Sequence, residues 1–181
     1  MTAFNPLRRA LLGSFSLFCA GALARVPTGA PALLLAREAA PDVDPAGFLV
    51  SEKLDGVRAF WDGEVLRFRG GGVIAAPPWF LARLPRVALD GELWLGRGRF
   101  EELSALARRQ QARDAAWQQV RFMVFELPGA AGSFAARHAR LQALIDPLLW
   151  PQLVAVEQHV VPSNAVLNAR LQAVVRPAAK A

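Results

Sequence analysis

Hydrophobic and polar residues alternate in short runs from residue 48 onward, and glycine or proline residues separate the runs. The run VRAFW (57–61) has Ala59 and Trp61 on one face and Arg58 on the other, which is the two-residue period of a half-buried strand. An Asp-Gly pair follows directly and is a strong tight-turn signal. The predicted strands are FLVS (48–51), VRAFW (57–61), EVLRFR (64–69), RVALDGELWLG (86–96), VRFMVFEL (120–127) and LVAVEQHVV (153–161).

Other segments carry apolar residues at helical spacing, and one of them has a Ser or Asn N-cap candidate at positions 163 and 164. The predicted helices are a short piece at 33–37, PPWFLARL (77–84), FEELSALARRQ (100–110), DAAWQQ (114–119), SFAARHARLQALI (133–145) and SNAVLNARLQAVV (163–175). Hairpins interleaved with helices predict an α+β fold with a mostly antiparallel sheet. A length of 181 residues leaves room for one domain.

The first 24 residues have the layout of a secretory signal peptide. Two arginines at positions 8 and 9 precede an apolar run (10–22), and ALA at 22–24 supplies a cleavage site. The run is short for a transmembrane span, so an uncleaved membrane anchor is the minority alternative. We therefore expect an exported, periplasmic protein that has no stable membrane association once the signal is removed.

Composition adds a charge argument. The formal net charge is +6, and cleavage after residue 24 would lower it to +4 because two arginines and no acidic residue leave. Cleavage would also remove Cys19, the sole cysteine, so no disulfide framework is expected. Positive charge carried by arginine suits a polyanionic partner, although an arginine-rich codon bias with a solvated basic surface has the same composition.

Lys53 is unusual because only it and Lys180 are lysines among the 21 Lys and Arg residues. It begins the segment KLDGVR (53–58). Arginine cannot lose its proton and act as a nucleophile, whereas lysine can. Asp55 shares strand parity with Lys53, and Gly56 allows a tight turn or a close approach to a ligand. The same residues also suit an ordinary hairpin turn.

Two further strands carry polar residues where a structural strand would not need them. In LDGELW, Asp90 and Glu92 share one face, and such carboxylates cost stability unless they meet cations or a ligand. Pairing with nearby arginines alone would satisfy them. Phe125 and Glu126 end the strongly apolar strand and suit an aromatic platform beside a pocket, although Phe125 is a core residue by default.

Together these segments resemble the covalent nucleotidyltransferases and, within them, the ATP-dependent DNA ligases. KLDGVR matches their K-x-D-G-x-R motif, LDGELW their D-G-E motif and FMVFELPG the aromatic strand that follows, and LRFRGGG is similar to their arginine-containing segment. The sequence looks most like that of the minimal bacterial ligases that carry a signal peptide, and the resemblance runs from about residue 33 to residue 175. The resemblance implies a nucleotidyltransferase (ATP-grasp-like) adenylation domain with flanking helices.

The resemblance also implies roles. Lys53 would attack the α-phosphate of ATP to form lysine–AMP, with Mg²⁺ or Mn²⁺ as the metal. AMP would pass to the 5′-phosphate of nicked duplex DNA, and the 3′-hydroxyl would attack this DNA adenylate and seal the strand. The other implied roles are Arg58 on the ribose and phosphate of the nucleotide, Glu92 on the ribose or a metal-bound water, Phe125 stacked on adenine, Glu52 reading the base, Arg69 on the DNA 5′-phosphate, and Asp55, Gly56 and Asp90 as motif support.

The chain departs from the family pattern in two places. Glu126 stands where the family usually has Asp. After the last predicted helix the family continues with E-G-x-x-L-[RK], a K-x-K strand and an OB-fold domain, whereas here RPAAKA (176–181) follows. We therefore expect a lead-in (25–46), a partial adenylation domain (47–175) and a tail (176–181), with no OB domain and with ligation impaired in the chain by itself.

Two other function classes remain open. One is a non-catalytic remnant that binds nucleotide or nucleic acid. The other is a different covalent nucleotidyltransferase, such as an RNA ligase or a GTP-using capping enzyme, although the signal peptide and LDGELW argue against capping. The main hypothesis is a monomeric DNA ligase of DNA repair, recombination or replication, in which His138 and His159 are structural or solvated and are not metal ligands.

Overall fold

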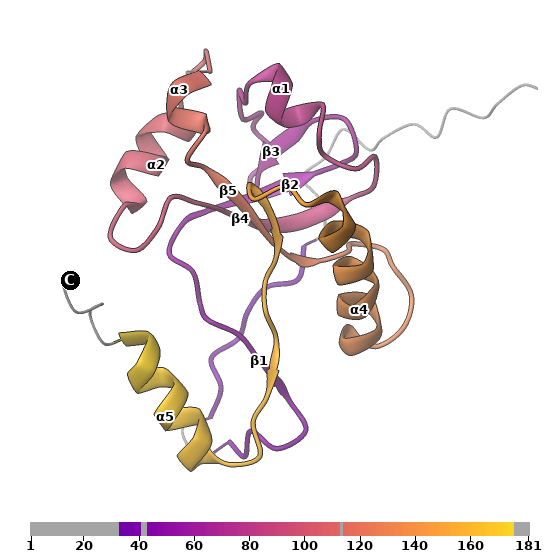
Figure 1. Ribbon diagram of the computed structural model, residues 1–181, viewed down its shortest axis with the longest axis vertical. Helices are drawn as coiled ribbons and strands as arrows, with labels where there is room; N and C mark the ends of the chain where they lie inside the picture. The colour runs from indigo at the N-terminus through magenta and orange to yellow at the C-terminus, as the bar shows by residue number, and fades with distance from the viewer. Residues whose placement is uncertain (1–32, 41–42, 113, 176–181) are drawn as a thin grey trace, which may run out of the picture.

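A five-stranded sheet forms the centre of the computed structural model, which describes residues 33–40, 43–112 and 114–175. The strand order is β3-β2-β4-β5-β6, and neighbours are antiparallel except for the parallel pair β5 and β6 (Figure 1). The bounds are β2 Val57–Trp61, β3 Leu66–Phe68, β4 Leu89–Trp94, β5 Arg121–Glu126 and β6 Leu153–Ala155. The predicted α+β fold with a mostly antiparallel sheet is confirmed.

Alternation along the two central strands decides which face of the sheet is buried. Ala59 and Trp61 of β2 and Leu89 and Leu93 of β4 are each at most 3% exposed and belong to one hydrophobic cluster. Gly91 lies between the two leucines of β4, and a Cβ there would collide with the backbone of β5. The opposite face of these strands is therefore free to carry polar side chains, as the two-residue period predicts.

Helices supply the remainder of this core. Their bounds are α1 Pro78–Leu81, α2 Phe100–Ala107, α3 Asp114–Trp117, α4 Phe134–Ile145 and α5 Asn164–Val175. The hydrophobic cluster takes residues from α1, α2, α3 and α4, and none from α5. At α4, Ser133 is the N-cap and its side chain accepts a hydrogen bond from the Ala136 N–H, as expected for a serine at this position.

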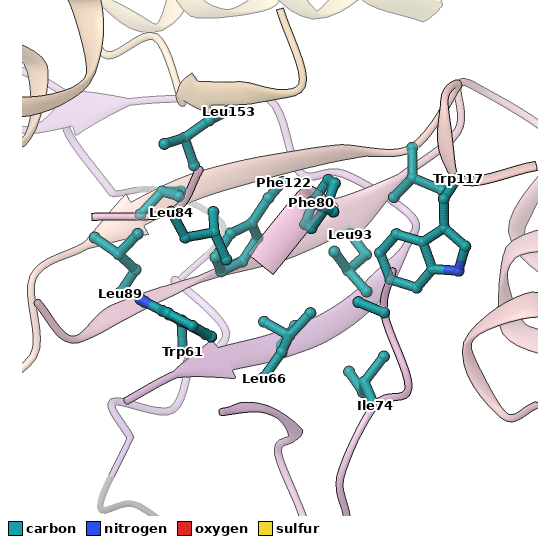
Figure 2. Packing of buried hydrophobic residues seen from close by; sticks show 14 of the residues in the cluster. Trp61, Leu66, Ile74, Phe80, Leu84, Leu89, Leu93, Trp117, Phe122 and Leu153 are labelled. Carbon is teal, nitrogen blue, oxygen red and sulfur yellow. The ribbon is translucent and has the colours of Figure 1, made fainter. Parts of the chain in front are cut away.

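The short helix α1 places Phe80 at the centre of the core. Figure 2 shows Phe80 among side chains from the sheet and from α3. Its ring meets Trp117 and Trp150 edge-on, with centroid distances of 5.1 and 5.2 Å. Trp61 packs nearby and its indole N–H donates to the Pro85 carbonyl at 2.7 Å, so this buried aromatic residue keeps its one polar atom satisfied.

A second, two-stranded sheet extends away from the first (Figure 1). It pairs β1 (Leu49–Val50) with β7 (His159–Val160) in antiparallel register, Leu49 opposite Val160. Helix α5 follows β7 and has no buried residue. The loop from β1 to β2, which carries Lys53, therefore runs from the small sheet to the large one.

The structure corrects two sequence predictions. The apolar run 153–161 was predicted as one strand, but it forms β6 in the large sheet and β7 in the small one. Glu157 and Gln158 lie between them, and because Val156 and Val161 are both buried, the hydrophobic pattern continues across the break. Residues 33–37 form no helix; this apolar segment is too short to nucleate one and instead lies beside the sheet.

The predicted signal peptide (1–24) and tail (176–181) lie outside the described residues, as does part of the predicted lead-in. None of the helices in the described part of the chain combines the length and the hydrophobicity that a transmembrane span requires.

Candidate functional site

A shift in strand register shapes the polar face of the sheet. Gly91 of β4 pairs with Val124 of β5, but the preceding residue, Asp90, pairs with Glu126. Phe125 is therefore an extra residue on β5. Such a bulge bends its strand and re-aims the neighbouring side chains. As a result Phe125 and Glu126 both line the cleft on the polar face.

Asp90 is held by Arg58 from the neighbouring strand. Two guanidinium nitrogens of Arg58 donate to the two carboxylate oxygens, at 3.1 and 2.7 Å, and the Asp90 side chain is 1% exposed. Burial raises the pKa of Asp90, and the hydrogen bonds and charge of Arg58 oppose that rise. The hydrogen bond to Asp90 also raises the pKa of Arg58, and the two side chains form a two-point, charge-assisted contact.

A second pair stands beside the first. Glu126 accepts two hydrogen bonds from Arg137 of α4, at 2.8 and 2.6 Å, and one from the Leu127 N–H at 2.8 Å. The hydrogen bonds from Arg137 are the main reason that the pKa of Glu126 is lowered. Two carboxylates on neighbouring strands are therefore neutralised by two arginines from different elements.

Arg58 makes two further contacts that tie the cleft together. The same nitrogen that donates to Asp90 at 2.7 Å also donates to the Leu34 carbonyl at 2.7 Å. The guanidinium carbon lies 5.3 Å from the centroid of the Phe125 ring, within the range of a cation–π interaction. Arg58 thus joins β2, β4, β5 and the chain segment before β1.

Glu92 holds the loop that carries Lys53. One carboxylate oxygen of Glu92 accepts a hydrogen bond from the Gly56 N–H at 3.1 Å. Burial raises the pKa of Glu92, whereas this hydrogen bond and the positive charges of Arg58 and Lys53 lower it. A Cβ on Gly56 would overlap the Leu93 carbonyl and the Glu92 side chain. Glycine is therefore required here because its backbone approaches β4 closely, whereas the sequence analysis expected a tight turn or a close approach to a ligand.

The cleft on this face has a volume of about 370 Å³, within the size range of small-molecule sites. It combines apolar side chains with a few polar groups. Its lining residues are Leu34, Leu35, Ala36, Leu49, Ser51, Arg58, Asp90, Phe125, Glu126, Phe134 and Gln158.

The structure brings some predicted site residues together and leaves others apart. Three of them, Arg58, Asp90 and Phe125, line the cleft. Lys53 and Asp55 are exposed on the adjoining loop, close enough to Glu92 to affect its pKa. The predicted roles of these residues stay predictions.

Glu52 and Arg69 also lie outside the cleft lining, as Lys53, Asp55, Gly56 and Glu92 do. Glu52 forms an exposed ion pair with Arg97 at 2.7 Å. Arg69 is exposed in the turn directly after β3.

Sequence reasoning missed Arg137 and seven of the residues that line the cleft. Arg137 pairs with Glu126 across a helix and a strand. The missed lining residues are Leu34, Leu35, Ala36, Leu49, Ser51, Phe134 and Gln158. The sequence did contain one signal for the Glu126–Arg137 pair, because Glu126 ends an apolar strand and so needs a cation nearby. Among so many arginines, nothing in the pattern selected Arg137.

The described residues contain no group of three or more His, Cys, Asp or Glu side chains that could hold a metal ion by themselves. One oxygen of Glu92 is engaged by Gly56, and its other oxygen makes no hydrogen bond within the described part of the chain. This donor set fits Mg²⁺ in its usual form, bound by one or two carboxylates together with substrate phosphates and water.

Comparison with known proteins places this geometry in context. No protein-family model matches the chain. It is 38% identical over 97 residues to the DNA ligase of Haemophilus influenzae, a match that covers 54% of this chain and 35% of that protein.

Two solved structures also match the chain. A structure from a structure–function study of Lig E DNA ligases, titled as DNA binding with a minimal scaffold, matches at 40% identity with a TM-score of 0.68. That match covers 74% of this chain and 52% of the other. A second structure, Pmar-Lig_PreS3, shares only the fold, at 18% identity and a TM-score of 0.50. The chain therefore spans between about a third and about half of the length of the DNA ligases it matches, and in sequence and fold it is similar to part of a DNA ligase.

Proposed function

We propose that this protein is an ATP-dependent DNA ligase that seals nicks in duplex DNA, and that the described domain supplies its nucleotide cleft and its nucleophile. Lys53 accepts AMP from ATP and passes it to the 5′-phosphate at the nick. The observation that carries the proposal is the position of the Lys53 loop, which Glu92 fastens at the edge of a cleft containing Arg58 and Phe125.

The lining of the cleft suits a nucleoside. Phe125, Phe134 and Leu49 offer apolar surface for a planar base, and aromatic rings stack well on such bases. Ser51 and Gln158 add groups that can donate and accept hydrogen bonds. Arg58 would reach the sugar–phosphate side with Nη1, the guanidinium nitrogen that holds neither Asp90 nor the Leu34 carbonyl.

The lysine is in reach of a nucleotide bound in this way. Ser51 lines the cleft, and Lys53 follows two residues later in a segment without regular secondary structure. If the segment is extended, two residues advance the chain by about 6.6 Å and return the side chain to the same side. With the base in the cleft, the phosphates would then point along the chain toward Lys53.

The transfer itself is a displacement at phosphorus. The Lys53 amine, after losing its proton, forms an N–P bond to the α-phosphorus while the P–O bond to pyrophosphate breaks and pyrophosphate leaves. The DNA 5′-phosphate oxygen then displaces the lysine to form DNA adenylate, and the 3′-hydroxyl displaces AMP. Such reactions depend on positioning and on positive charge near the phosphate oxygens. Arg58 provides that charge in the cleft, and a Mg²⁺ ion held near Glu92 would neutralise further phosphate charge.

The proposed partner is nicked duplex DNA. The formal net charge of +6 favours binding to a polyanion, and Arg69 is proposed to hold the 5′-phosphate. The signal-like residues 1–24 support export to the periplasm, where the protein would act as a monomer in DNA repair or recombination.

The decisive substitution is Lys53→Arg, which keeps the positive charge but removes the nucleophile. The matched control is Lys180→Arg, the other lysine of the sequence. Because the chain spans only part of the ligases it matches, both changes are made in the chain itself and in a fusion that adds the remaining part of a matched ligase after Ala181. Each protein is incubated with ATP, Mg²⁺ and nicked duplex DNA.

Intact-mass measurement then reports the AMP adduct, and gel analysis reports nick sealing. We expect the fusion to gain one acid-labile AMP and to seal nicks. Lys53→Arg should abolish both, and Lys180→Arg should leave both unchanged. An adduct of normal yield on the Lys53→Arg protein would falsify the assignment of the nucleophile, and a folded fusion that forms no adduct would refute the proposed activity.

A further inference from the structure

The segment before β1 forms part of the cleft although no motif of the sequence includes it. We name residues 33–36 the N-terminal strap. Leu34, Leu35 and Ala36 line the cleft, and Leu33 and Leu34 also line an adjoining hollow of about 320 Å³ that contains Asp90, Glu126 and Arg137. The strap therefore runs along both buried ion pairs.

A hydrogen bond fastens the strap to the site. The Leu34 carbonyl accepts from Arg58 at 2.7 Å, and the donor nitrogen is the one that also binds Asp90. The Arg58 guanidinium in turn lies over the Phe125 ring. A movement of the strap would therefore change the position of Arg58, and with it the guanidinium that covers the Phe125 ring.

Two of the three leucines of the strap expose much apolar surface beside charged groups. Leu34 and Leu35 are each 67% exposed, while Arg58, Asp90 and Glu126 line the same cleft. Exposed leucines are common on protein surfaces, but here they are part of a concave wall that also contains Phe125 and Phe134. A ligand that covers them needs an apolar face together with a polar or charged end, which describes a nucleoside phosphate.

We propose that Leu34 and Leu35 are base-binding residues, and that the N-terminal strap forms the part of the nucleotide site that contacts the base. This inference rests on the proposed function, because it names a binding surface for the same ligand. The strap contributes to binding of the base and not of the phosphates, since its side chains are apolar and its carbonyl carries no positive charge.

The test compares a Leu34→Ala/Leu35→Ala protein with the unaltered protein by titration calorimetry. The ligands are adenosine, ATP with Mg²⁺, and tripolyphosphate, which has no base. Leu171→Ala is the control, since Leu171 is a 53% exposed leucine on α5, outside the cleft. The midpoint of thermal unfolding is measured for each protein. Because Leu34 and Leu35 are exposed, their substitution should leave this midpoint nearly unchanged.

We expect the double substitution to weaken binding of adenosine and of ATP by about fivefold to thirtyfold, the effect of losing the apolar contact of two partly covered leucines. Binding of tripolyphosphate should not change, and Leu171→Ala should change nothing. Hydrogen exchange of the strap amides should slow when adenosine binds to the unaltered protein.

The outcomes separate the inference from the proposed function. If the unaltered protein binds adenosine and the double variant binds it equally well, the strap is not a base site and the proposed function stands. Equal weakening of adenosine and tripolyphosphate would also overturn the inference, because it would show a general disturbance of the cleft. If the unaltered protein binds neither adenosine nor ATP, the proposed function and the inference fail together.

Discussion

Replacing Arg58 by alanine should destabilise the protein strongly, because it leaves a carboxylate buried without its partner. The Asp90 side chain is 1% exposed and takes both of its charged hydrogen bonds from Arg58. Removing one partner of a buried ion pair typically costs about 3–5 kcal/mol. Since the Arg58 side chain is 21% exposed and water can enter the space it leaves, we expect a value near the lower end, about 3 kcal/mol.

Urea unfolding followed by fluorescence of the buried tryptophans measures this loss. The double substitution Arg58→Ala/Asp90→Ala removes the stranded charge and should recover most of the stability. Arg97→Ala is the matched control, because Arg97 and Glu52 form an exposed ion pair, for which the expected loss is at most about 1 kcal/mol.

The pH dependence gives an independent check. Burial already raises the pKa of Asp90, and without Arg58 the opposing influence is gone. A folded-state pKa above the unfolded value means that the folded variant binds protons more readily, so its deficit should shrink as the pH falls and grow as the pH rises through the folded pKa. A loss no larger than that of Arg97→Ala, or a double variant as unstable as Arg58→Ala, would refute the reasoning.

Two further predictions concern Gly56 and His138. Gly56→Ala should lower the free energy of unfolding, measured in urea, by about 1–3 kcal/mol, because the new Cβ would overlap the Leu93 carbonyl. Gly70→Ala places its Cβ in open space and should change the same quantity by no more than about 0.5 kcal/mol. Equal effects of the two substitutions would contradict the close-approach argument. His138 is buried without a hydrogen-bond partner among the described residues, and burial lowers its pKa. The unfolded chain therefore binds a proton more readily, so stability should decline as the pH falls below about 6.5 and continue to decline down to the folded pKa. His138→Phe should reduce this slope, and an unchanged slope in His138→Phe would assign the pH dependence to other groups.

The sequence predicted the central strands well because their pattern is local. Ala59 and Trp61 alternate with Arg58, and Leu89 and Leu93 alternate with Asp90, so each strand could be oriented from its own residues. The run 153–161 failed for a physical reason. A chain that passes from one sheet to another can stay apolar across the crossing, so hydrophobicity alone does not reveal where pairing changes partner.

The site was predictable only where chemistry is local. Lys53 and Arg58 lie five positions apart in one motif, and the position of Gly56 between them has room only for glycine. The Glu126–Arg137 pair could not be predicted, because it depends on how α4 packs against β5. The N-terminal strap could not be predicted either, since its contact uses a backbone carbonyl, a group that every residue has.

The pairing of β1 with β7 has a consequence for the order in which the protein assembles. Leu49 and Val160 come from opposite ends of the described domain, and contacts between such distant residues form late because a long loop must close first. A chain growing from the ribosome can complete β2, β3, β4 and β5 while the partner of β1 is still unmade. The sheet can therefore exist before the loop of Lys53 is anchored at its β1 end, so Lys53 gains its position only when synthesis of the domain is almost complete.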